Sequence, residues 1–223
     1  MGMCFGIQRR QVEDDDAYQH TDIAVVKSRI AAKRLPIIWM NGVEGCGMHN
    51  HGCNIAERFG YAYIPLENLI RQEMINTTAR GRIIKTRIAN SRRIPDRIVL
   101  DLIKEKMIAA GDTRGYLISE FPQNPRQANL FVKEFGKISC ILIMESQSQI
   151  NELTENPPGD RKITQPNRKI SQKERKIDFY KDLKITSGKC DTVVEKINVN
   201  EKPADVFLKI EAAILDRLAA TQT

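Results

Sequence analysis

Residues 37–50 combine two glycines at the spacing of a phosphate-binding loop. Gly42 and Gly47 follow an apolar run and precede a helical pattern, the context that a G-x-x-x-x-G-K-[ST] motif requires. In that motif backbone N–H groups cradle phosphate, the lysine reaches the β- and γ-phosphates, and the hydroxyl holds Mg²⁺. Here Met48 stands at the lysine position and His49 at the hydroxyl position. The loop therefore keeps the glycines of a phosphate site and lacks its charged side chain.

The same stretch contains two cysteines and two histidines, Cys46, His49, His51 and Cys53. Zinc uses such ligands. If a helix begins near Met48, His49 and Cys53 share one face, whereas His51 points roughly 200° away from His49. At most three ligands converge, so we expect polar substitution in a former phosphate site and no metal.

The composition is that of one globular domain. The chain has 223 residues, of which 28% are charged and 41% hydrophobic, enough for a single core. No apolar run approaches the length of a transmembrane helix. The five cysteines are odd in number and form no C-x-x-C pair, and no secretory signal precedes them. We therefore expect a cytoplasmic protein with free thiols.

The net charge of +7 is unevenly distributed. Residues 71–97 contain eight basic and two acidic residues, and residues 161–189 contain ten basic and three acidic ones. Such stretches indicate either solvated helical surfaces or a site for an anion, which includes nucleotide phosphate and acidic proteins. Aromatic residues make up only 6% of the chain, and no nucleic-acid-binding motif accompanies the charge. We therefore expect no nucleic-acid partner.

Apolar strands and helical patterns alternate along the chain, which predicts a doubly wound parallel sheet. Ligands of such sheets bind beyond the carboxyl ends of the strands, where the glycine loop lies. The expected strands cover residues 36–40, 61–64, 115–119, 138–144 and about 192–198. The expected helices cover residues 48–58, 66–76, 80–90, 95–110, about 169–183 and about 203–219.

Residues 1–35 form a polar leader with an acidic run, and we expect this leader to stay outside the core. Gly2 at its start suits N-myristoylation, with Cys4 as a palmitoyl partner. Gly6 stands where the myristoylation pattern prefers Ser or Thr. The alternatives are peripheral membrane anchoring through an acylated N-terminus and an ordinary flexible tail.

Residues 36–218 resemble an adenylate kinase of the short, cytosolic type. The resemblance implies a P-loop NTPase-like α/β fold, with a five-stranded parallel sheet flanked by helices. It also implies flap-like helices over the AMP site at 66–95 and a short lid-like segment at 154–168. The landmarks occur in order: the loop Gly42–Asn50, Phe59-Gly60-Tyr61, Leu69-Ile70-Arg71, Ala79-Arg80-Gly81, Ile94-Pro95 and the stretch from Gly115 to Gln123.

Departures from the family pattern fall on the chemistry. The resemblance implies that Met48 replaces the phosphate-binding lysine, Gln123 a phosphate-binding arginine, and Asn50 and Ser119 two residues near Mg²⁺. The Thr-Gly pair of the AMP site becomes Leu66-Glu67, and a glycine becomes Glu120. The remnants of nucleotide binding are then Gly42, Gly45, Gly47, Arg71 for the AMP phosphate and Gln127 for adenine.

Phosphoryl transfer depends on positioned charge, so these departures predict a pseudoenzyme without catalytic residues or cofactor. Its expected role is structural or scaffolding, with an acidic protein such as a cytoskeletal filament as partner, in the cytoplasm or in an axoneme. Two alternatives remain open. One is a nucleotide sensor without turnover, and the other is a residual nucleoside monophosphate kinase that uses ATP, AMP and Mg²⁺.

Overall fold

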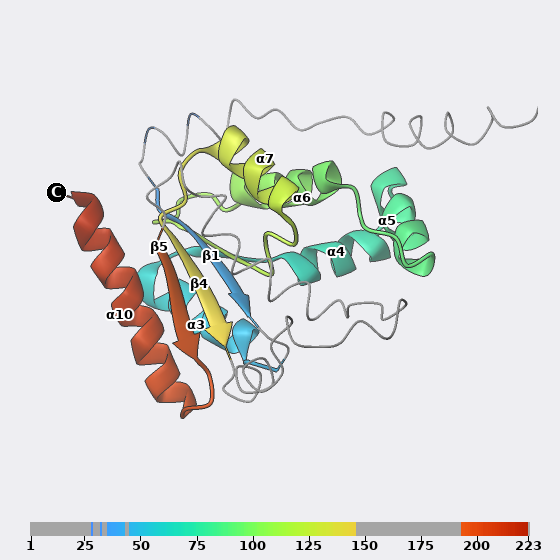
Figure 1. The fold of residues 1–223 in the computed structure, drawn as a ribbon. Helices are drawn as coiled ribbons and strands as arrows, with labels where there is room; N and C mark the ends of the chain where they lie inside the picture. The colour runs from blue at the N-terminus through green and yellow to red at the C-terminus, as the bar shows by residue number, and fades with distance from the viewer. Residues whose placement is uncertain (1–27, 29–31, 33–34, 43–44, 146–192, 223) are drawn as a thin grey trace, which may run out of the picture.

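A computed structural model describes residues 28, 32, 35–42, 45–145 and 193–222 of the chain, drawn in colour in Figure 1. Several predictions fall on other residues. The leader, apart from Ser28, Ala32 and Leu35, lies outside the described residues, and so do Gly2 and Cys4. The lid-like segment at 154–168 and the helix expected at 169–183 also lie outside them.

The described strands form one five-stranded sheet in the order β2-β3-β1-β4-β5, and every pair is parallel. This confirms the predicted α/β fold class. Because all strands run in the same direction, Gly42 and Ser119 lie at the carboxyl end of the sheet, together with the last residue of β4. The strands are β1 (Ile37–Gly42), β2 (Ala62–Pro65), β3 (Tyr116–Ser119), β4 (Cys140–Glu145) and β5 (Val193–Asn198).

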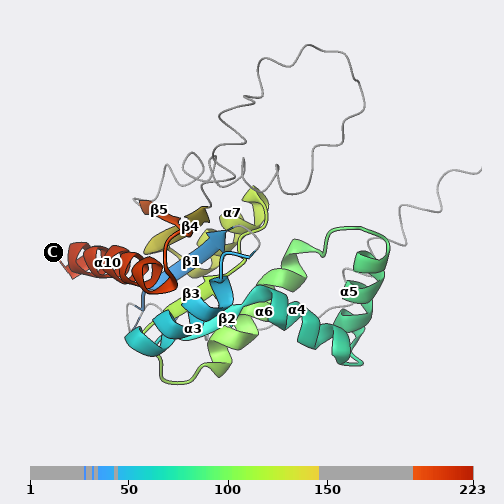
Figure 2. The same ribbon diagram turned by 90° about the horizontal axis from the view of Figure 1, so that it is seen from below.

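Helices cover both faces of this sheet (Figures 1 and 2). Successive side chains of β1 point to opposite faces. Ile37 and Trp39 pack with α6 (Asp96–Ala109) and α7 (Pro125–Phe135), whereas Ile38 and Met40 pack with α3 (Met48–Phe59) and α10 (Pro203–Gln222). Trp39 contacts Phe121 and Phe131 edge to face, with ring centroids 5.4 and 5.5 Å away. The strand that leads to the glycine loop is therefore fixed on both sides.

Helices α4 (Leu66–Ile75) and α5 (Ala79–Ala89) project from the sheet on the side opposite α10 (Figures 1 and 2). They fall within residues 66–95, for which the resemblance predicts flap-like helices, and that role stays a prediction. Their small core joins Ile84 of α5 to Ile98 and Leu102 of α6. Within the described residues, no helix is both long and apolar enough to span a membrane.

Helix α7 was not predicted. The sequence signals its start, because Asn124 is an N-cap residue whose side chain accepts a hydrogen bond from the Gln127 N–H at 2.9 Å. Pro125 follows at the first helical position, where its missing N–H costs nothing. The Asn-Pro pair, together with the apolar face that α7 buries against the sheet, is the sequence signal for this helix.

Candidate functional site

The glycine loop lies between the central strand β1 and the start of α3. Gly45 and Gly47 adopt left-handed conformations, with φ of 80° and 71°. Gly47 is the N-cap residue of α3; it provides no side-chain cap, and the first turn contains no acidic residue. The first N–H groups of a helix have no intrahelical partner, and the helix dipole favours an anion there. The loop therefore offers an anion-binding site made of backbone.

Gly42 can only be glycine in this fold. A Cβ atom at this position would lie 2.7 Å from the Cβ of Met144 and 2.9 Å from its carbonyl oxygen. Gly42 pairs with Met144 in the β1–β4 register, so neither backbone can move without disturbing the sheet. Of the two glycines that define the motif, Gly42 is thus required by close packing against β4, and Gly47 by its left-handed backbone conformation.

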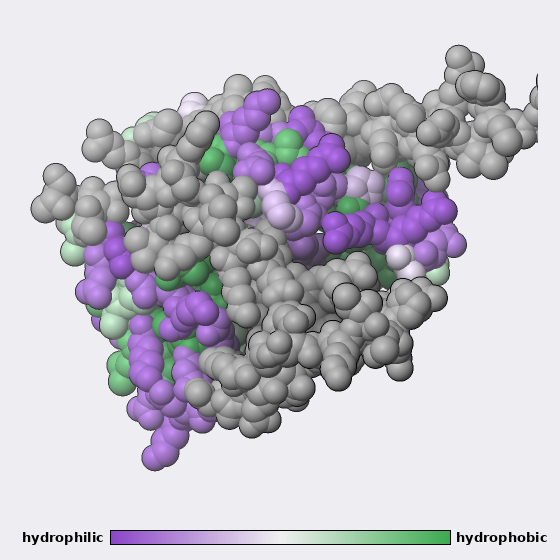
Figure 3. All heavy atoms as spheres, viewed as in Figure 1, coloured by the Kyte–Doolittle hydropathy of each residue, from purple (hydrophilic) through white to green (hydrophobic). Residues whose placement is uncertain are grey.

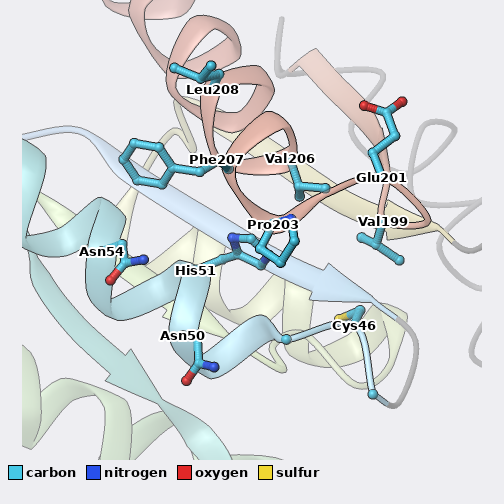
Figure 4. Close-up of a pocket in the computed structure, with 13 residues that line it drawn as sticks. Cys46, Asn50, His51, Asn54, Val199, Glu201, Pro203, Val206, Phe207 and Leu208 are labelled. Carbon is cyan, nitrogen blue, oxygen red and sulfur yellow. The ribbon is translucent and has the colours of Figure 1, made fainter.

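A pocket of about 670 Å³ opens beside this loop, between α3 and the start of α10 (Figure 4). The loop side contributes Gly45, Gly47, Asn50 and the buried His51. The opposite wall is largely apolar. It consists of Val199, Pro203, Ala204, Val206, Phe207 and Leu208, together with Glu201. A pocket with these two walls suits a ligand that has an anionic end and an apolar, planar part.

Three of the four positions predicted as degenerate lie near the loop. Met48 begins α3 and packs against the apolar cluster shared by α3 and α10, and Asn50 lines the pocket. Ser119 ends β3 beside β1, in register with Met40. Its hydroxyl is 3.1 Å from the hydroxyl of Tyr63, and burial raises the pKa of Tyr63 to about 12.

Arg71 lies on α4, in a chain of charges that includes two carboxylates. Its guanidinium donates to Glu67 at 2.9 Å, and the side chain is 70% exposed. The Glu67 N–H, at the first turn of α4, donates to the carboxylate of Glu120 at 2.9 Å. Glu120 has φ of 63°, a left-handed conformation that is uncommon for residues other than glycine. A carboxylate of the chain itself thus occupies the α4 N-terminus.

Gln123 and Gln127 lie at the start of α7. Gln127 is 1% exposed, and its side-chain oxygen accepts from the Gln123 N–H at 2.9 Å. Its amide nitrogen donates to Asp96 at 3.1 Å. These bonds fasten the β3–α7 connection to the start of α6. The predicted role of Gln127 in adenine binding stays a prediction, beside this structural role.

Among the described residues, no three His, Cys, Asp or Glu side chains gather where they could hold a metal ion. The Sγ of Cys53 is 3.8 Å from Nε2 of His49, which is the shared face expected from their spacing. Burial raises the pKa of the Cys46 thiol, so this cysteine stays protonated at neutral pH.

Sequence reasoning missed the far wall of the pocket. Val199, Pro203 and Phe207 lie about 150 residues after the glycine loop and have no chemistry of their own. They reach the loop only because β5 pairs with β4 at the edge of the sheet and α10 packs against α3. The sequence pointed to His51 only as a candidate metal ligand, yet His51 is buried in the pocket wall whereas His49 and Asn50 are exposed.

The curated proteins most like this chain include several adenylate kinases. The chain is 26% identical over 185 residues to adenylate kinase isoenzyme 5 of Homo sapiens, covering 82% of the chain and 33% of that protein. It is 26% identical over 189 residues to adenylate kinase isoenzyme 1 of Cyprinus carpio, covering 83% and 97%. An adenylate kinase of Streptococcus pyogenes is 27% identical over 206 residues, covering 78% and 96%.

The chain thus spans about a third of the length of isoenzyme 5 and nearly all of isoenzyme 1. No model of a known protein family matches the chain.

These comparisons correct one prediction. The substitutions at Met48, Asn50, Ser119 and Gln123 led us to expect that the chain is not an enzyme. The relatives are named as adenylate kinases, which are enzymes, and this contradicts that expectation. The physical reason is that a glycine loop at a helix N-terminus can hold phosphate largely through backbone N–H groups, which side-chain substitutions leave in place.

The fold, the position of the glycine loop and the similar proteins are consistent with one another. The parallel sheet has β1 at its centre, the glycine loop follows β1, and the similarity to adenylate kinases extends over about four fifths of the chain. These findings support the adenylate kinase family for this chain.

Proposed function

We propose that the chain binds a nucleoside polyphosphate on its glycine loop and transfers a phosphoryl group between nucleoside phosphates. The observation that carries this proposal is the uncapped N-terminus of α3, which opens on a pocket with an apolar far wall. The polyphosphate would lie on the N–H groups of Gly47 and Met48, and the base would lie toward Phe207. ATP with Mg²⁺ and AMP are the proposed substrates, since the relatives are named adenylate kinases.

The reaction should be slow. Met48 leaves the loop without a lysine, and one missing transition-state donor costs about 10²–10³ in rate. We expect the conversion of ATP and AMP to ADP to proceed below about 1 s⁻¹, the lower end for ordinary enzymes. A coupled assay on the purified protein measures this rate.

The matched variant for this assay is Gly47→Val, which places a branched side chain at φ 71° and disturbs the backbone cradle. We expect it to lose at least tenfold in rate, while circular dichroism shows a folded protein. A native rate no higher than that of Gly47→Val would contradict the proposal.

We further propose a scaffolding role toward an acidic protein, carried by α5 and the turn after it. Lys85, Arg92 and Arg93 are exposed there, and hydrophilic side chains cover α5 in Figure 3. The surface is smaller than the eight basic residues of 71–97 suggested. Arg71 pairs with Glu67, Arg80 with Glu73 and Glu105, and Arg97 with Glu134.

An acidic cytoskeletal filament, such as the microtubules of an axoneme, has the charge that this surface would recognise, and the proposed location is the cytoplasm. We expect Arg92→Glu/Arg93→Glu to lose most of its co-sedimentation with microtubules, and added salt to weaken the native binding, because exposed charges are screened. Lys106→Glu/Lys133→Glu makes the same change of charge on α6 and α7 and should bind normally. Equal binding by both variants would exclude the docking surface.

A further inference from the structure

His51 is a buried polar side chain in the wall of the pocket. It is 7% exposed, and its Nδ1 atom has no hydrogen-bond partner among the described residues. Buried polar groups are nearly always hydrogen-bonded, so an unpaired one indicates a missing partner. Burial also lowers the pKa of His51, so the imidazole is neutral at pH 7 in the free protein.

The imidazole lies against the glycine loop. The backbone N–H of His51 donates to the carbonyl of Gly47 at 3.0 Å. A Cβ atom on Gly47 would lie 3.4 Å from Cδ2 of the ring and 3.6 Å from Nε2. From α3 the ring points toward Pro203 at the start of α10, inside the pocket (Figure 4). An anion on the Gly47 and Met48 N–H groups would therefore lie next to this ring.

We propose that His51 takes up a proton when the loop binds a polyphosphate, so that its imidazolium supplies the positive charge that Met48 does not. This inference rests on the proposed function for the identity of the ligand, a nucleoside polyphosphate. An opposite charge within about 4–6 Å favours the charged form of a histidine, and the effect is strong where water is partly excluded. Ligand affinity then rises as the pH falls through the range in which His51 titrates.

The other titratable groups around the pocket do not supply this charge. The Cys46 thiol is neutral when protonated, and Glu201 is an anion whose partner is Lys209 at 2.5 Å. Arg58 pairs with Glu211 at 2.6 Å between α3 and α10. His49 is exposed, with its ring 5.6 Å from that of Tyr63. Asn50 and Asn54 are neutral, which leaves His51 as the buried base in this wall.

The test uses pyrophosphate as the probe and histidine NMR signals as the readout. The full-length native protein is titrated from pH 5 to pH 8.5 with and without pyrophosphate, and His51→Gln identifies the His51 signal. We expect pyrophosphate to raise the His51 pKa. We also expect the native protein to bind pyrophosphate about tenfold more tightly at pH 6 than His51→Gln does, and about equally at pH 8. The ionisation of pyrophosphate itself affects both proteins equally.

His49→Gln is the matched control, two residues earlier on α3, and it should retain the pH dependence. An unchanged His51 pKa, or a pH dependence that disappears in His49→Gln and persists in His51→Gln, would overturn the inference. The proposed function is tested separately by the coupled assay. If pyrophosphate raises the His51 pKa while ATP and AMP give no turnover, the inference stands and the phosphoryl-transfer proposal fails.

Discussion

Replacing Lys104 by methionine should destabilise the protein by about 3–5 kcal/mol, because the change removes one charge of a buried ion pair and leaves the charge of Asp101 in the core. Both side chains on α6 are 0% exposed, and the Lys104 ammonium is 2.7 Å from Asp101. Methionine preserves most of the apolar stem and removes only the charge. For a domain of this size the melting temperature should fall by roughly 10 °C, and urea unfolding measures the free energy directly.

The double variant Asp101→Leu/Lys104→Met is the control. Replacing both members of a buried ion pair by apolar residues is often neutral or stabilising. We therefore expect the double variant to regain most of the stability lost in Lys104→Met. A loss below 1 kcal/mol in the single variant would show that solvent reaches the pair. The pair matters for the site because α6 contacts β2, α4 and α7, and so supports both the sheet and the flap-like helices.

Replacing Arg80 by methionine should cost about 3 kcal/mol at pH 7 and loosen the contact between α4, α5 and α6. Arg80 donates to Glu73 at 3.0 Å and to both carboxylate oxygens of Glu105, at 2.6 and 2.9 Å. Arg80 and Glu73 are both buried, so the variant leaves the Glu73 carboxylate with only uncharged partners, among them the Thr78 hydroxyl 2.5 Å away and Asn76.

The loss of stability in Arg80→Met should depend on pH. The hydrogen bond from Arg80 holds the pKa of Glu73 below its ordinary value of 4.5. A depressed pKa gives stability that is fully present above pH 4.5 and is lost as the pH falls through the folded-state pKa. In Arg80→Met only burial and weaker partners remain, so the Glu73 pKa rises. The stability difference between the two proteins should therefore be smaller at pH 3.5 than at pH 7.

Arg82→Met is the matched control, since Arg82 is exposed on the same helix and its guanidinium donates to the Thr77 carbonyl at 3.1 Å and to no carboxylate among the described residues. It should change stability by less than about 0.5 kcal/mol at either pH. If Arg80→Met and Arg82→Met unfold at the same urea concentration, the buried arginine is not a structural link between the flap-like helices.

The framework of the site follows from the local order of residues. Strand β1 is a run of apolar residues bounded by Pro36 and Gly42, and α3 follows a glycine that no side chain could replace without strain. These features depend on neighbours in the chain, on backbone conformation and on burial of apolar runs, so they can be predicted from residue order. The same holds for α4 to α6, whose predicted ranges overlap the observed ones.

The partners of the polar side chains depend on how distant elements pack together. Arg80 sits in a predicted basic surface yet lies buried between two carboxylates, one of them 25 residues away. The side-chain amide of Gln127, the predicted adenine contact, is hydrogen-bonded to the Gln123 N–H and to Asp96. His51 lies in a pocket only because α10 packs against α3 and forms the opposite wall. A side chain's partner is set by which distant elements pack beside it, and the hydrophobic pattern that drives this packing does not specify polar pairs.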